Sequence, residues 1–311
     1  MLAFPALILA LFQFGLIDGF KVTGSITVTL AVFSGRPDPT WTLDPKDSTY
    51  GPIKRSLGEL KPKNTHGAKQ MPPRLGYKGF LLRSMTDEVL IVGSETKKLQ
   101  VLLLESIPQG TLLNGTIEDV KEEIESDKAT ASTTPPVSPA QGPKRVKRFE
   151  PRIGMWSPSF RTIKCNNCYN YANTLITDNF AQPGFSIGHV FGQMDGASVQ
   201  QAAESDGLIP LNPQPGAAAP VPPAPAGFAH LVALVVDPGT ALRQGDFHWY
   251  RLDQYGVWSH KPGSTFVTAL DNAGALITDP RVADMGHYRF VSFMYSDITI
   301  VNIAGNLICP Y

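Results

Sequence analysis

Residues 246–263 read DFHWYRLDQYGVWSHKPG, and this stretch determines the expected fold of the C-terminal half. Two runs rich in aromatic residues flank a short turn, a pattern that predicts a β-hairpin. Facing side chains on paired antiparallel strands lie close enough to interact. We therefore expect His248 to lie across from His260 or Lys261, where one imidazole could orient the other.

Upstream, residues 166–173 read NNCYNYAN, with polar residues before a run that suits a helix. Asparagine is a good N-cap, so Cys168 is predicted to lie at the start of a helix. A helix dipole and a neighbouring imidazolium can lower the pKa of a thiol below its ordinary ~8.5. The expected chemistry is a Cys168 nucleophile, with His248 as its base and His260 as the group that orients the base.

The chain has three cysteines, an odd number, so at least one of them has no partner for a disulfide within the chain. We expect a Cys165–Cys309 disulfide, which would fix a terminus that otherwise frays. A Cys165–Cys168 bridge or redox pair is the alternative. A zinc site would need further ligands at finger-like spacing, which the sequence lacks, so neither a metal nor an organic cofactor is expected.

The order of these groups resembles that of the papain-like fold, in particular NlpC/P60 and CHAP-type peptidases and amidases. The resemblance covers roughly residues 160–300. It implies an α+β domain in which a helix bearing the cysteine packs on an antiparallel sheet. It also implies hydrolysis or acyl transfer at amide bonds of peptides or peptidoglycan-like polymers. The Pro/Ala-rich stretch at 208–227 departs from the usual core.

The segments CYNYA, DFHWYR and WSHKPG also resemble a little-characterised family of secreted proteins, some of them associated with shell or other extracellular matrix. This second resemblance implies a non-catalytic matrix or binding protein on a papain-like scaffold. The aromatic residues Trp249, Tyr250, Tyr255 and Trp258 could then line a groove for a peptide, a glycan or a matrix polymer, although strand aromatics often serve only packing.

The N-terminus is typical of a secreted protein. Residues 2–17 carry no charge, are mostly apolar and are followed by Asp18 and Gly19, which predicts a signal peptide over 1–19. The run is shorter than the ~20 residues of a membrane-spanning helix, so no stable membrane insertion is expected. An Asn-Gly-Thr triplet makes Asn114 a candidate glycosylation site.

Residues 20–128 are predicted to form a β-rich pro-region. Apolar residues alternate with threonines over 22–33, and further strand-like runs occur at 79–82, 89–92 and 99–104. One acidic helix is expected over 117–128.

Residues 129–148 are rich in Pro, Ser and Thr and predict a disordered linker. The linker ends in a basic cluster whose Arg145, Lys147 and Arg148 resemble a furin-type proprotein convertase site. Cleavage after Arg148 would release residues 149–311 as the papain-like domain. A solvated basic run is the alternative.

Charge excludes one class of partner. The chain has 27 basic and 27 acidic residues, so it has no excess positive charge to hold a polyanion. We therefore expect a secreted protein without a nucleic-acid partner.

Overall fold

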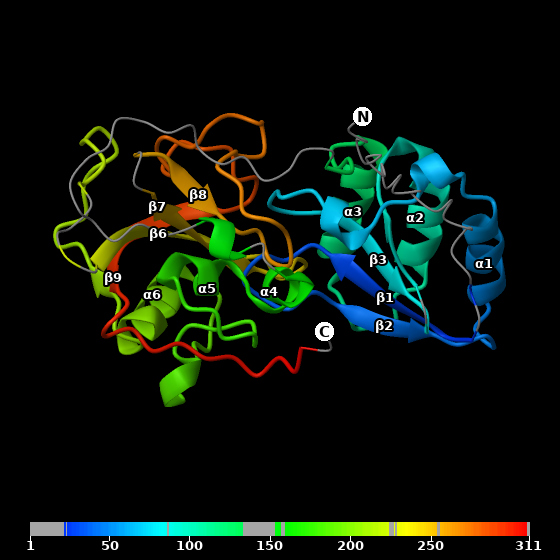
Figure 1. Ribbon diagram of the computed structural model, residues 1–311, viewed down its shortest axis with the longest axis horizontal. Coiled ribbons are helices and arrows are strands. Elements are labelled where there is room, and N and C mark those ends of the chain that lie inside the picture. Colours follow the sequence, from blue (N-terminus) through cyan, green and yellow to red (C-terminus); the bar gives the residue numbers. More distant parts are fainter. Residues whose placement is uncertain are drawn as a thin grey trace, which may run out of the picture.

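The computed structural model describes residues 22, 24–85, 87–132, 153–156, 159–223, 227, 229–253 and 256–309. The described residues before 133 are called the N-terminal unit, and those from 153 onward the C-terminal unit. The predicted signal peptide and the basic cluster at Arg145, Lys147 and Arg148 lie outside the described residues. The fold mixes helices with two antiparallel sheets, which lie side by side in two lobes (Figure 1).

The N-terminal unit has a four-stranded sheet in the order β2-β1-β3-β4. Its strands are β1 (Ile26–Ala31), β2 (Thr40–Leu43), β3 (Gly79–Arg83) and β4 (Glu88–Ile91), and its helices are α1 (Tyr50–Gly58), α2 (Lys97–Glu105) and α3 (Asn114–Glu125). The alternation expected in β1 is present, because Ile26, Val28 and Leu30 are buried and the threonines between them are half-buried.

One predicted strand is wrong. Residues 99–104 lie in helix α2, where Leu99, Leu103 and Leu104 are buried. A short apolar run fits either a buried strand or one face of a helix, and here the buried positions follow the helical spacing. The N-terminal unit is therefore less purely β than the sequence suggested, since helices accompany its sheet.

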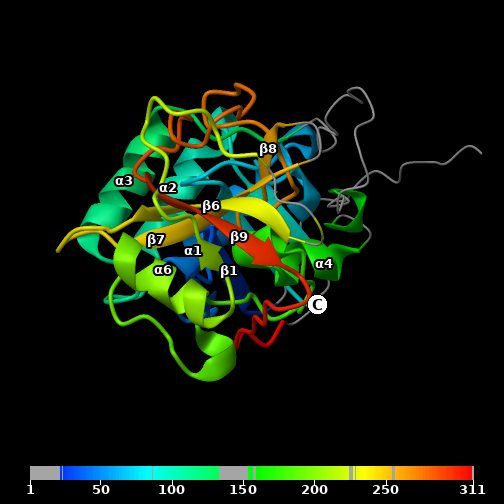
Figure 2. The ribbon, with the colours of Figure 1, turned by 90° about the vertical axis from the view of Figure 1, so that its left-hand side faces the viewer.

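The C-terminal unit has a five-stranded antiparallel sheet in the order β5-β9-β6-β7-β8. The strands are β5 (Ile209–Pro210), β6 (Ala229–Asp237), β7 (Asp246–Leu252), β8 (Trp258–His260) and β9 (Arg289–Asp297), and the helices are α4 (Phe160–Cys165), α5 (Cys168–Asn173) and α6 (Gly196–Ser205). Figure 2 looks onto this unit, with α6 on one side of β6, β7 and β9.

Short 3₁₀ helices complete the described structure at Pro62–Asn64, Ala68–Gln70, Ser94–Thr96, Ile153–Trp156 and Phe185–Ile187. No helix among the described residues is long and apolar enough to cross a membrane.

The predicted hairpin is formed by β7 and β8, which pair antiparallel with Tyr250 opposite His260. His248 and Tyr250 are two residues apart and share a face of the sheet. His248 is thus diagonal to His260 rather than directly opposite, still close enough for contact.

The two units share their cores. Leu75 of the N-terminal unit packs in the cluster formed by Leu231, Ala233 and other residues of the C-terminal sheet. Conversely, Phe160 of α4 packs against the N-terminal core. Hydrogen bonds also cross between the units, such as those of Leu75 with Asn272 at 2.9 and 3.2 Å. The two units are therefore held together by shared apolar packing and by hydrogen bonds.

Candidate functional site

Cys168 is the first residue of α5, as the sequence predicts. Asn167 caps the helix, and its side-chain oxygen accepts hydrogen bonds from the backbone of Tyr169 and Asn170, each at 3.1 Å. The thiol is fully buried and lies 3.9 Å from the carbonyl oxygen of Phe247 in β7. The cap fixes the thiol against the strand that carries His248.

His248 and His260 are in direct contact. The Nε2 atom of His248 lies 2.8 Å from Nδ1 of His260, and Nε2 of His260 lies 3.0 Å from the carbonyl oxygen of Leu270. The other ring nitrogen of His248, Nδ1, lies 2.6 Å from the hydroxyl of Ser34, which belongs to the N-terminal unit. Both nitrogens of His248 are thus occupied, and neither is hydrogen-bonded to Cys168.

The donor and acceptor in each of these hydrogen bonds follow from the last acceptor, the Leu270 carbonyl. The Leu270 carbonyl can only accept, so His260 donates from Nε2 and, when neutral, accepts at Nδ1. His248 then donates from Nε2 and accepts at Nδ1, and Ser34 donates its hydroxyl proton. The three hydrogen bonds that connect Ser34, His248, His260 and Leu270 can therefore all form when both imidazoles are neutral.

Burial keeps these groups uncharged. Desolvation lowers the pKa of His248 well below its ordinary value and lowers the pKa of His260 to about 4. Burial also raises the pKa of the Cys168 thiol far above its usual range, and the carboxylate of Asp246 acts in the same direction. In the intact chain these surroundings favour a neutral thiol beside a neutral imidazole, not a thiolate–imidazolium pair.

Ser34 lies next to both predicted catalytic groups. Its hydroxyl donates to Nδ1 of His248, and the same residue is close to the thiol of Cys168. Ser34, Cys168 and His248 are all fully buried. A substrate cannot reach the thiol while this segment is in place.

Asp246 holds the same N-terminal segment. Its carboxylate accepts from the backbone N–H groups of Ser34 at 2.6 Å and Arg36 at 3.0 Å, and from the Tyr288 hydroxyl at 2.6 Å. Burial raises the pKa of Asp246. The sequence does not indicate the role of Ser34, because residues 34–39, SGRPDP, are typical of a surface turn.

Lys261, the other residue expected opposite His248, has a different role. Its fully buried ammonium donates to the carbonyl oxygens of Ile163, Asn166 and Gly263. Desolvation lowers its pKa well below the ordinary value. It links α4 to the loop after β8 and does not contact His248 or Cys168 through a hydrogen bond.

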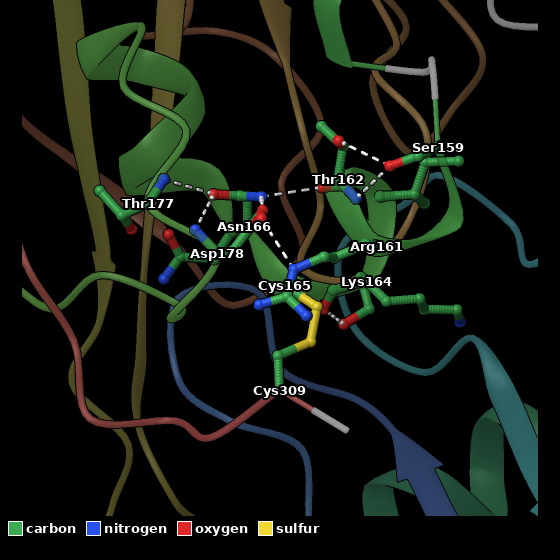
Figure 3. Close-up of a disulfide and its surroundings, with 12 residues drawn as sticks. Ser159, Arg161, Thr162, Lys164, Cys165, Asn166, Thr177, Asp178 and Cys309 are labelled. Carbon is green, nitrogen blue, oxygen red and sulfur yellow. Dashed lines mark hydrogen bonds and ion pairs between the residues drawn. A yellow bond between two sulfur atoms is a disulfide. The ribbon is translucent and has the colours of Figure 1, made fainter. Parts of the chain in front are cut away.

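The structure contains a Cys165–Cys309 disulfide, with Cα atoms 5.6 Å apart, and leaves Cys168 as a free thiol. Figure 3 shows the bridge at the end of α4, next to Asn166, which accepts from the backbone N–H of Thr177 and of Asp178. The Cys165–Cys168 alternative does not occur in this structure.

The hairpin aromatics do not form an open groove. Trp249, Tyr250 and Trp258 are fully buried, and Tyr255 lies outside the described residues. Trp249, Tyr250 and Trp258 therefore pack in the interior of the C-terminal unit.

Asn114 is an exposed residue at the start of α3. The third residue of its triplet, Thr116, is buried and donates to the Gln244 side chain at 2.8 Å. Glycosylation of Asn114 stays a prediction.

The part of the chain that the structure describes contains no group of three or more His, Cys, Asp or Glu side chains placed to hold a metal ion.

The fold and the site together define a mixed α and β protein with two antiparallel sheets, in which buried hydrogen bonds from Ser34 through His248 to His260 join the N-terminal unit to the C-terminal sheet. Over 149 residues the chain is 43% identical to insoluble matrix shell protein 1 of Ruditapes philippinarum, a match covering 47% of this chain and 88% of that protein. The chain belongs to the family of this shell matrix protein. No protein-family model matches the chain. No solved structure matches it either.

Proposed function

We propose that the protein is a non-catalytic component of an insoluble extracellular matrix, secreted and retained there by a matrix polymer. The observation that carries this proposal is the burial of Cys168 and His248 beneath Ser34, a segment of the same chain. A hydrolase must expose its nucleophile to substrate, whereas a matrix protein has no such need. The shell matrix relative supports the same role.

The test is fractionation of the extracellular material laid down by the organism or by cells that secrete the chain. Peptides of this protein should stay in the residue after mild aqueous extraction and be released by denaturant. Recovery only in the soluble secretion, together with amidase activity that Cys168→Ala abolishes, would contradict the matrix role.

A second candidate is a papain-like thiol hydrolase that is latent in the intact chain, made as a proprotein and cut after Arg148. One observation favours it: the side-chain amides of Asn167 and Gln182 both donate to the carbonyl of Gly35, each at 2.8 Å. Paired donors on one carbonyl oxygen are the arrangement that stabilises an oxyanion.

This candidate predicts hydrolysis of peptide or peptidoglycan amides once the N-terminal unit is removed. The measurement is turnover before and after cleavage, with Cys168→Ala as the control. Turnover that appears only after cleavage and only with Cys168 would favour the hydrolase over the matrix role.

A further inference from the structure

Residues 33–36 of the N-terminal unit enter the C-terminal unit in the way a bound peptide would. The Asp246 carboxylate accepts from the backbone N–H groups of three consecutive residues, Ser34, Gly35 and Arg36, at 2.6 to 3.3 Å. Asp246 is buried, and hydrogen bonds to a buried carboxylate are among the strongest in proteins. These contacts bind the backbone of the segment and do not depend on its side chains.

The carbonyl side of the segment is held as well. Asn167 and Gln182 donate to the oxygen of Gly35. The Asn167 amide is fixed in this direction, because its oxygen is committed to capping α5. The N-cap residue of α5 and a loop residue of the C-terminal unit thus bind the same peptide carbonyl.

Only glycine fits at the centre of the segment. A Cβ atom on Gly35 would lie 2.4 Å from the carbonyl oxygen of Phe247 and 2.4 Å from its ring. The backbone oxygen cannot rotate away as a side chain could. The cleft therefore admits only a small residue at this position. It also binds both the N–H groups and the Gly35 carbonyl of the segment.

Among the described residues, no covalent bond joins the N-terminal unit to the C-terminal unit. The one disulfide, Cys165–Cys309, lies within the C-terminal unit. A second noncovalent contact lies at α3, where Gly115 donates to the Leu242 carbonyl at 2.7 Å and Thr116 bonds Gln244. The association of a cut chain would thus rest on noncovalent contacts.

We propose that Asn167, Gln182, Asp246 and His248 form a peptide-binding cleft of the C-terminal unit, and that its ligand is the chain's own segment 33–36. A chain cut in the linker, at the predicted convertase site or elsewhere, then remains a two-fragment complex. The N-terminal fragment is a lasting subunit rather than a discarded pro-region. This inference does not depend on the matrix role.

The experiment uses the full chain with a specific protease sequence inserted within residues 133–143. After complete cutting, the sample is examined by size-exclusion chromatography under native conditions. Both fragments should elute together at the mass of the uncut chain and separate only in denaturant. Elution as two separate fragments would overturn the proposal.

Variants then test the cleft itself. Gly35→Ala and Asp246→Asn should each speed dissociation of the cut complex by about tenfold or more. The first variant places a methyl group against the Phe247 carbonyl, and the second can turn an amide N–H toward the backbone N–H groups that the carboxylate accepted. The matched controls are Gly51→Ala, where nothing lies within 4 Å of the new methyl group, and exposed Glu204→Gln. Dissociation no faster than in the controls would place the binding elsewhere and overturn the cleft.

If either cleft variant fails to fold, as judged by loss of a cooperative unfolding transition, Ser34→Ala replaces it. This smaller change removes the hydroxyl that donates to His248 and should speed dissociation by about fivefold. A rate equal to that of the controls would again contradict the proposal.

Discussion

The two sheets differ in what they bury. The N-terminal sheet buries mainly apolar side chains, such as Val28, Leu30 and Phe80, whereas the C-terminal sheet also buries His230, His248 and Arg251 within its strands. Apolar groups need only close packing, but buried polar groups need specific partners. His248 finds one of its partners in the other unit, so the polar sheet is the one that depends on the contact between the units.

The largest effect is expected from the apolar sheet. Phe80→Ala removes a fully buried ring from β3 and should lower the free energy of unfolding by about 3 to 5 kcal/mol. Denaturant unfolding measures this loss. The control Thr42→Ala, at an exposed position of β2, should cost under about 1 kcal/mol. Equal losses in the two variants would refute the described core.

The disulfide should come next. It closes a sequence separation of 144 residues, and its removal by Cys165→Ala with Cys309→Ala should lower the free energy of unfolding by about 2 to 5 kcal/mol. Thermal unfolding of the oxidised protein and of the double variant measures the difference. An unchanged unfolding temperature would show that the bridge does not stabilise the C-terminal unit.

Acid should weaken the polar sheet selectively. His260 has an ordinary pKa of 6.5 that burial lowers to about 4. Its contribution is therefore fully present above about pH 6.5 and is lost as the pH falls through about 4, a loss on the order of 3 kcal/mol. The raised pKa of Asp246 acts in the opposite sense, because its contribution is present at low pH and lost as the pH rises, so it offsets part of this loss.

The measurement is the free energy of unfolding from about pH 7 to about pH 4. His260→Gln should make the curve shallower, with the remaining slope coming from buried His248 and His230, whose pKa values burial also lowers. Thr42→Ala, at an exposed position of β2, should leave the shape of the curve unchanged. A wild-type curve as flat as that of His260→Gln would mean that His260 does not stay neutral in the fold.

The smallest effect is expected at the junction of the two units. Ser34→Ala leaves Nδ1 of buried His248 without its hydroxyl donor and should lower the free energy of unfolding by about 1 to 3 kcal/mol. Nitrogen NMR of the two histidines should also show a changed tautomer balance. Unchanged His248 signals would indicate that Ser34 is not its partner in solution.

Local features of the site could be predicted from the sequence. The capping asparagine places Cys168 at a helix start, and the alternation around the hairpin brings His248 near His260. The diagonal register could not be predicted, since it depends on a turn whose length the pattern does not fix.

The partner of His248 could not be predicted either. Ser34 is 214 residues away in the chain and lies in a stretch typical of a turn. Nothing local to residues 34–39 indicates that their backbone is bound by a buried carboxylate. The sequence indicates Cys168 and His248 but not the segment that lies against both of them, because that contact arises only from tertiary packing.

The burial of a neutral Cys168 thiol is tested most directly by its reactivity in the intact, non-reduced chain. With Cys165 and Cys309 bridged, iodoacetamide can label only Cys168. Because the Cys168 thiol is buried and neutral, labelling of the native chain should be negligible from about pH 6 to about pH 8, and rapid at about pH 8.5 once denaturant exposes the thiol. Fast labelling of the native chain at about pH 6, slowed by His248→Ala, would contradict this expectation and restore the catalytic thiolate.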